Sequence, residues 1–187
     1  MYKTKDFFLT PMLKKDIENE RYRSWFTDQD VTKFNSHGLF PKSEKALIDF
    51  ADNLGNNNLV LKICHHDVCS DGTHWIGNAS LQSFNFINHS AELAIVIGEK
   101  TDWGKGLGTS VCEILLYHAF IKIGFHRVWT GTSKLNVGMQ RICEKIGMKH
   151  EGTSRAGMYL LGEYHDIFHY GILRNEISFN PITREKY

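Results

Sequence analysis

The stretch AELAIVIGEKTDWGKGLGT, residues 91–109, decides the fold class of this chain of 187 residues. Its first part is apolar and rich in β-branched side chains, which predicts a central β-strand. Its second part holds three alternating glycines, Gly104, Gly106 and Gly108, and the amphipathic run over residues 110–123 predicts a helix after them. The segment is therefore predicted to be a strand, a glycine-rich turn and a helix N-terminus.

The glycine-rich turn is a candidate anion-binding site. Alternating glycines let a ligand approach the backbone closely, and successive N–H groups at the start of a helix carry partial positive charge, so a pyrophosphate fits there. The GxGxG spacing differs from the GxGxxG of dinucleotide-binding folds, and the Lys-Ser/Thr ending of a nucleotide-triphosphate loop is missing. A simple connection that lets strand and helix pack is the alternative.

Predicted elements outside this segment indicate a mixed sheet. Ser70, Asp71 and Gly72 mark a turn that joins two predicted strands as an antiparallel hairpin, and Ser43 is a candidate helix cap. Strands come first and then alternate with helices, which favours an α/β or α+β architecture. The remaining predictions are strands over residues 7–9, 59–64, 75–81, 127–132 and 167–173, and helices over residues 14–28, 43–52 and 137–146.

Composition predicts one globular, cytoplasmic domain over residues 1–187. Hydrophobic residues make up 42% of the chain, and 22 Lys and Arg balance 21 Asp and Glu, so no global field attracts nucleic acid or an anionic membrane. The 4 cysteines follow no disulfide-scaffold pattern, and the start, MYKTKDFF, lacks the apolar stretch of a signal peptide. The longest mostly apolar stretch, residues 114–125, is too short to cross a bilayer.

Four segments match, in order, the motifs of one known family. The turn WGKGLG at residues 103–108 matches a Q/R-x-x-G-x-G/A loop, and residues 136–152, NVGMQRICEKIGMKHEG, match an Asn followed by a helix that ends in EKxGF and then EG. Residues 162–166, GEYHD, match a closing G-x-Y-x-D, and residues 25–31, WFTDQDV, match an opening W-x-x-D-x-x-V. Together they resemble the GNAT superfamily of N-acetyltransferases, in the branch of ribosomal-protein and small-amine acetyltransferases.

This resemblance implies a fold, a reaction and a donor. The fold is a mixed, mostly antiparallel central sheet flanked by helices, and the reaction transfers the acetyl group of acetyl-CoA to an amine. The donor pyrophosphate would lie on the amides of residues 105–109 and the pantetheine along the preceding strand, while Asn136 contacts the pantetheine or, alternatively, only caps a helix. The cofactor-binding residues so implied are Val96, Ile97, Trp103, Gly104, Lys105, Gly106, Leu107, Gly108, Thr109 and Asn136.

Catalysis needs a base, because an alkylammonium has a pKa of about 10.4 and no lone pair at pH 7. The resemblance assigns this role to Glu92, directly or through water, and an exposed or ion-paired carboxylate is the alternative. A splay between adjacent strands would offer a backbone N–H to the thioester carbonyl, with Val96 nearest to that role by resemblance. The acid that protonates the departing thiolate is left open as Cys143, Tyr164 or solvent, since Cys143 stands where many relatives carry a Tyr.

The acceptor pocket is expected near NSHGLFP, residues 35–41, where relatives form part of it. Three acceptors remain open: an amino sugar (nucleotide) or other small amine, a protein N-terminal amine, and a polyamine. The substrate-binding candidates are Trp25, Asn35, Ser36 and His37, and a loop without contact to substrate is the alternative. A sugar nucleotide would need basic side chains for its phosphates, for which Lys33, Lys42 and Arg155 are conceivable.

A metal site is not expected. Residues 64–69, CHHDVC, hold two thiols and two imidazoles, but neighbours on a strand point to opposite faces and no second ligand pair has zinc-finger spacing. A noncatalytic CoA-binding or sensing module is the rival function, because the usual Tyr is absent at position 143. A homodimer is left open as the assembly.

Overall fold

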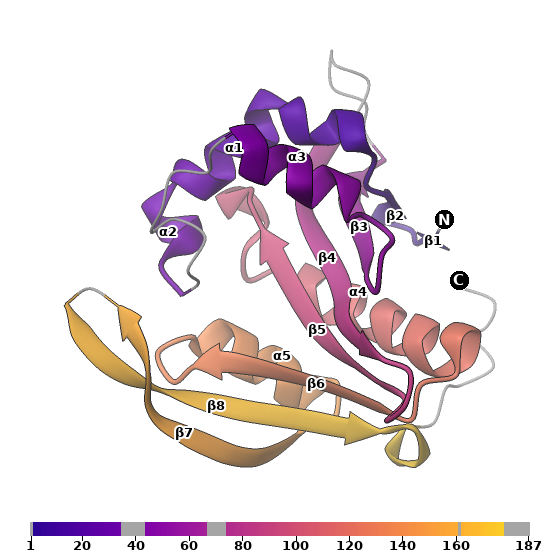
Figure 1. Ribbon diagram of the computed structural model, residues 1–187, viewed down its shortest axis with the longest axis vertical. Coiled ribbons are helices and arrows are strands. Elements are labelled where there is room, and N and C mark those ends of the chain that lie inside the picture. The colour runs from indigo at the N-terminus through magenta and orange to yellow at the C-terminus, as the bar shows by residue number, and fades with distance from the viewer. Residues whose placement is uncertain (1, 35–43, 67–73, 161, 178–187) are drawn as a thin grey trace.

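The computed structural model describes residues 2–34, 44–66, 74–160 and 162–177, and these build one eight-stranded sheet (Figure 1). The strand order is β1-β2-β3-β4-β5-β6-β8-β7, and every neighbouring pair is antiparallel except β5 and β6. The predicted mixed, mostly antiparallel sheet is confirmed. The strands are β1 (Tyr2–Lys3), β2 (Phe7–Pro11), β3 (Leu59–His65), β4 (His74–Asn85), β5 (Ser90–Ile97), β6 (Arg127–Ser133), β7 (Lys149–Leu160) and β8 (Glu163–Leu173).

Helices cover the two faces of the sheet through separate apolar cores. Buried side chains of η1, α1 and α3, with Trp75 among their sheet partners, pack on one face, whereas α4 and α5 pack on the other face around residues such as Leu93 and Phe120. Figure 1 shows the first group above the sheet and the second behind it. The helices are η1 (Lys14–Glu18), α1 (Glu20–Thr27), α2 (Gln29–Thr32), α3 (Glu44–Asp52), η3 (Lys100–Asp102), α4 (Leu107–Tyr117), η4 (His118–Ile123), α5 (Val137–Lys145) and η5 (Arg174–Glu176).

The parallel pairing of β5 with β6 is short. It joins Ser90 to Arg127, Ala91 to Val128 and Glu92 to Trp129, and beyond these pairs the two strands diverge like a V (Figure 1). The continuous antiparallel ladder with β4 holds the other side of β5 up to Ile97. The predicted splay is therefore present, and it leaves one edge of β5 without a strand partner.

One prediction of secondary structure was wrong, and one long strand was missed. The single helix over residues 14–28 is broken at Asn19, whose Oδ1 accepts hydrogen bonds from the N–H groups of Arg21 (3.0 Å) and Tyr22 (3.3 Å) and so starts a second helix. Strand β7 was missed because it is a polar, mostly exposed edge strand with two register shifts, without the apolar alternation that marks a strand. The predicted turn at residues 70–72 and the cap Ser43 lie outside the described residues.

Within the described part of the chain, no helix is long and apolar enough to cross a membrane.

Replacing Gly77 by Ala should loosen the ladder between β4 and β5. A Cβ at this position would lie 2.3 Å from the carbonyl oxygen of Val96, which is backbone and cannot rotate away. We expect the free energy of unfolding in urea to fall by about 2 kcal/mol or more. Gly152→Ala on β7 is the control, because a Cβ there meets nothing within 4 Å, and equal losses in both variants would contradict this packing.

Candidate functional site

The glycine loop turns directly into α4, three residues earlier than the predicted start of the helix. Gly104 and Gly106 have φ values of +75° and +83°, in the left-handed region that favours glycine, and nothing lies within 4 Å of the Cβ position of either. Gly106 is the N-cap of α4. The loop is therefore open to solvent and followed by the unpaired N–H groups of a helix start, which can bind an anion.

Gly108 serves a different purpose from the other two glycines. A Cβ at Gly108 would lie 2.8 Å from Cδ1 of Ile142 on α5. The absence of a side chain therefore lets the first turn of α4 pack closely on α5, which carries Asn136 as its N-cap.

A buried carboxylate anchors the loop to the sheet. Asp102 is only 7% exposed, and its Oδ1 lies 3.0 Å from Nε2 of His65 on β3 and 3.5 Å from Nζ of Lys105. The largely exposed Lys105 ammonium is thus held at the glycine loop, where it can meet an anion. Nothing in the sequence pairs His65 with Asp102, because the contact joins strand and loop across the fold.

The hydrogen-bond pattern determines which backbone groups of β5 are free. The N–H of Gly98 donates to the carbonyl of Ile76 on β4 (2.8 Å), and alternate residues of a strand turn their backbone groups to the same side. Val96 therefore directs its N–H and carbonyl toward β4. The expectation that the Val96 N–H serves the thioester carbonyl is corrected, because this group faces the ladder rather than the V.

The backbone N–H and carbonyl groups of the odd-numbered residues of β5 point toward the V. The carbonyl of His89 accepts a hydrogen bond from the N–H of Arg127 on the β6 side (3.1 Å), and the carbonyl of Ile97 accepts one from the Trp103 indole N–H (2.9 Å). Ile95 is also odd-numbered, so its backbone groups point the same way as those of His89 and Ile97. It lies beyond Glu92, the last residue of β5 that pairs with β6. The Ile95 backbone and the Ile97 N–H are therefore the groups available to an extended ligand along this edge.

Glu92 lies at the closed end of the V, in the last residue pair with β6. Its neighbours Ala91 and Leu93 are fully buried on the α4 side, so the half-buried Glu92 side chain lies on the opposite face of the sheet. Its Oε2 accepts a hydrogen bond from Ser83 Oγ (3.3 Å). Among the described residues, no basic side chain lies within 4.0 Å of this carboxylate.

Neither candidate acid is placed for its role. Cys143 is fully buried, and burial raises the pKa of its thiol to about 12, which makes it a poor proton donor at neutral pH. Tyr164 is 71% exposed beside Tyr159 near the end of the β7–β8 hairpin. The residue of β8 level with Glu92 is Gly171, because Trp129 pairs with both, so Tyr164 lies about 23 Å along the strand from that level.

Two further candidates have structural roles. Trp25 is 4% exposed, lies against the backbone of Gly98 and donates its indole N–H to Glu99 (3.2 Å), which contradicts a direct substrate contact. Asn136 caps α5 by accepting a hydrogen bond from the Met139 N–H (3.1 Å), so a ligand contact would use its Nδ2 or the second lone pair of Oδ1. Asn35, Ser36, His37 and Lys42 lie outside the described residues.

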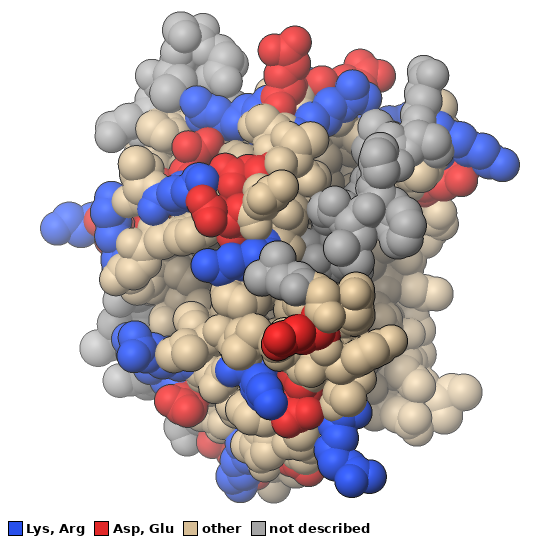
Figure 2. All heavy atoms as spheres, turned by 90° about the vertical axis from the view of Figure 1, so that its left-hand side faces the viewer, with Lys and Arg blue, Asp and Glu red and all other residues tan. Residues whose placement is uncertain are grey.

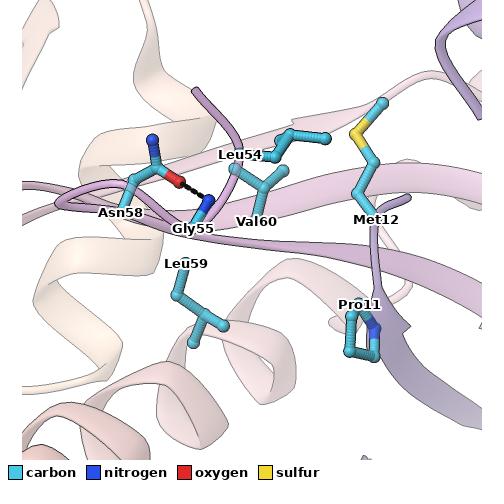
Figure 3. A pocket seen from close by; sticks show the side chains of 7 residues that line it. All are labelled: Pro11, Met12, Leu54, Gly55, Asn58, Leu59 and Val60. Atoms are coloured by element: carbon cyan, nitrogen blue, oxygen red, sulfur yellow. Dashed lines mark hydrogen bonds between the residues drawn. The ribbon is translucent and has the colours of Figure 1, made fainter. Parts of the chain in front are cut away.

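The face onto which the V opens carries both charge signs. Figure 2 shows basic and acidic side chains interspersed over it, without a large patch of one sign. No group of three or more potential metal ligands occurs among the described residues. A small cavity of about 160 Å³ between residues 11–12 and 54–60 is largely apolar, its Asn58 Oδ1 is already bonded to the Gly55 N–H, and no residue of the glycine loop lines it (Figure 3).

Solved structures share this fold. A structure titled probable acetyltransferase is 26% identical with a TM-score of 0.74, covering 92% of this chain and 96% of that chain. A spermidine N-acetyltransferase from Vibrio cholerae, titled as a complex with CoA and spermine, has a TM-score of 0.77 over 91% of this chain and 96% of that chain. Its 18% identity supports the fold alone.

Two sequence relatives are named as N-acetyltransferases. The "Probable N-acetyltransferase YjcK" of Bacillus subtilis is 30% identical over 89% of this chain and 93% of its own length. The "Putative ribosomal N-acetyltransferase YdaF" of Bacillus subtilis is 32% identical, but the match spans only 54% of this chain and 54% of that relative. The acetyltransferase (GNAT) domain family matches residues 6–149, and the chain therefore belongs to the GNAT family of acetyl-CoA-dependent N-acetyltransferases.

Proposed function

We propose that this enzyme transfers the acetyl group of acetyl-CoA to the primary amine of a small molecule, by direct attack of the amine on the thioester. One observation carries the proposal: the open glycine loop, the free edge of β5 and the Glu92 carboxylate occur along a single strand and its continuation. Donor binding and proton removal therefore share one rigid support, which orients the reacting groups.

The donor would be held by backbone groups. Its pyrophosphate lies on the N–H groups of residues 105–109, where the start of α4 favours negative charge, with the Lys105 ammonium beside it. Its pantetheine amides extend the sheet along Ile95 and Ile97, in place of the strand partner that β5 lacks there. A free N–H on this edge would also stabilise the oxyanion of the tetrahedral intermediate.

Glu92 would act as the general base. It takes a proton from the bound ammonium, directly or through water, and the neutral amine then attacks the thioester carbonyl. The N–C bond forms, the C–S bond breaks with its electron pair leaving on sulfur, and the second proton on nitrogen passes to solvent as the amide forms. Solvent protonates the CoA thiolate, because Cys143 is sealed in the core and Tyr164 lies far along β8. A thiol pKa of about 8.5 makes the thiolate a good enough leaving group for this route.

The acceptor class is proposed as a small amine, including an amino sugar nucleotide. Lys33 and Arg155 are exposed and could pair with its phosphates. The partial match to a relative named for ribosomal acetylation favours a protein N-terminal amine as the second candidate, and the spermidine acetyltransferase fold neighbours add a polyamine. Measuring thiol release from acetyl-CoA with a UDP-amino sugar, with spermidine and with an N-terminal ribosomal peptide distinguishes the three acceptor classes. CoA binding without turnover of any of these amines would favour a noncatalytic sensing module.

We also propose that the enzyme is a single domain that works in the cytoplasm, as a monomer or as a homodimer. The described cysteines Cys64, Cys112 and Cys143 are free and buried, which suits a reducing compartment.

Substituting Gly106 by Ala should weaken donor binding. Alanine at a φ of +83° strains the loop that presents the N–H groups, so we expect Kd for acetyl-CoA in isothermal titration to rise about tenfold. Gly124→Ala is the matched control, because Gly124 has a φ of +85°, has nothing within 4 Å and lies after η4. Similar effects of both variants on Kd would argue against the loop as the donor site.

Substituting Glu92 by Gln should remove the base while leaving the donor site intact. We expect kcat with the best amine of the panel to fall at least about a hundredfold, the usual size of a general-base contribution, with Kd for acetyl-CoA unchanged. Glu113→Gln, at an exposed glutamate on α4, is the control. Unchanged kcat in Glu92→Gln would remove Glu92 from the mechanism.

A further inference from the structure

The segment that leads from β5 into the glycine loop is bound to the first helices of the chain. The indole of Trp25 on α1 lies on Gly98 so closely that a Cβ there would be 2.1 Å from the ring. Glu99 accepts the Trp25 indole N–H (3.2 Å) and lies 3.7 Å from Nε of Arg21, also on α1. A buried aromatic ring and a polar contact therefore fix α1 to the loop.

Lys100 makes a second, separate connection. Its Nζ lies 2.9 Å from Oδ2 of Asp28 and 2.8 Å from Oδ2 of Asp30, at the junction between α1 and α2. Asp28 also caps α2, by accepting a hydrogen bond from the Asp30 N–H (2.9 Å), and the hydrogen bond from Lys100 is the main cause that lowers its pKa. One loop side chain thus holds the N-terminus of α2.

Helix α2, which Lys100 restrains, lies close to the V. Figure 1 shows α2 at the open end of the V between β5 and β6, across from the end of the β7–β8 hairpin. An acceptor that approached a thioester in the V from its open end would pass this helix. A restraint on α2 is therefore a restraint on one wall of the acceptor path.

We propose that Lys100 is a positioning residue that couples occupancy of the glycine loop by the donor to the order of α1 and α2. The inference rests on the proposed donor site and adds a link between donor and acceptor. When CoA immobilises residues 104–109, the adjoining residues 98–102 lose mobility, and their contacts pass the restraint to Trp25, Asp28 and Asp30. Lys100 need not touch either substrate.

Hydrogen-exchange mass spectrometry of the full chain with and without CoA tests the link. In the wild type, saturating CoA should slow amide exchange over residues 104–112 and also over residues 20–32, the latter about fivefold, within the ordinary range of coupling between sites. In Lys100→Met the protection of residues 104–112 should remain, while that of residues 28–32, which Lys100 contacts through Asp28 and Asp30, should fall below about twofold. Asp30→Asn, which removes one partner from the helix side, should reduce the protection in the same direction.

A matched control separates coupling from loss of an ion pair. Lys14→Met breaks an exposed pair with Asp52 (2.5 Å) on η1 and α3 and should leave the CoA response of residues 20–32 unchanged. Kd for CoA should stay within about twofold in Lys100→Met, since a merely unfolded variant would lose binding as well.

Two outcomes overturn the inference in distinguishable ways. Protection of residues 104–112 without protection of residues 20–32 in the wild type, or protection of residues 28–32 that is unchanged from the wild type in Lys100→Met, removes the coupling and leaves the proposed donor site intact. Absence of protection in both regions of the wild type contradicts the donor site itself, and the coupling with it.

Discussion

The short parallel pairing between β5 and β6 is the constraint on which the site depends. After three residue pairs the strands separate, while the antiparallel ladder with β4 keeps β5 straight up to Ile97. Backbone N–H and carbonyl groups must be paired or solvated, so an unpartnered edge in the middle of a sheet is a place for a ligand with amide groups of its own. The pantetheine arm of acetyl-CoA has that chemistry, and this edge ends at the glycine loop.

The loop is held from both sides of the sheet. Asp102 joins it to His65 on β3, and Glu99 and Lys100 join it to α1 and α2. Its glycines have two different roles. Gly104 and Gly106 adopt the left-handed backbone conformation that the turn requires, whereas Gly108 leaves room for the Ile142 side chain. A loop anchored at several points presents its N–H groups already in place, so less order has to be imposed when the pyrophosphate binds.

The sequence was sufficient for the family, the class of fold and the turn before α4, because glycine spacing and apolar periodicity are local signals. It did not predict β7, whose polar edge residues lack that periodicity, or the break at Asn19, where a capping side chain interrupts an apparently continuous helix. At the site, the roles of Glu92 and the glycine loop come from the sequence and remain proposals. The direction of the Val96 backbone, the burial of Trp25 and Cys143, and the place of Tyr164 on β8 could not be predicted. Their positions depend on strand parity, burial and register across the sheet, which no local pattern contains.

A crystal structure of the enzyme with CoA tests the central claim most directly. The account predicts that the pantetheine lies between β5 and β6, with its amides hydrogen-bonded to the backbone of Ile95 and the N–H of Ile97, and that the pyrophosphate lies on the N–H groups of residues 105–109. A CoA molecule bound away from this edge, or strands β5 and β6 closed against each other with the pyrophosphate off the loop, would contradict it.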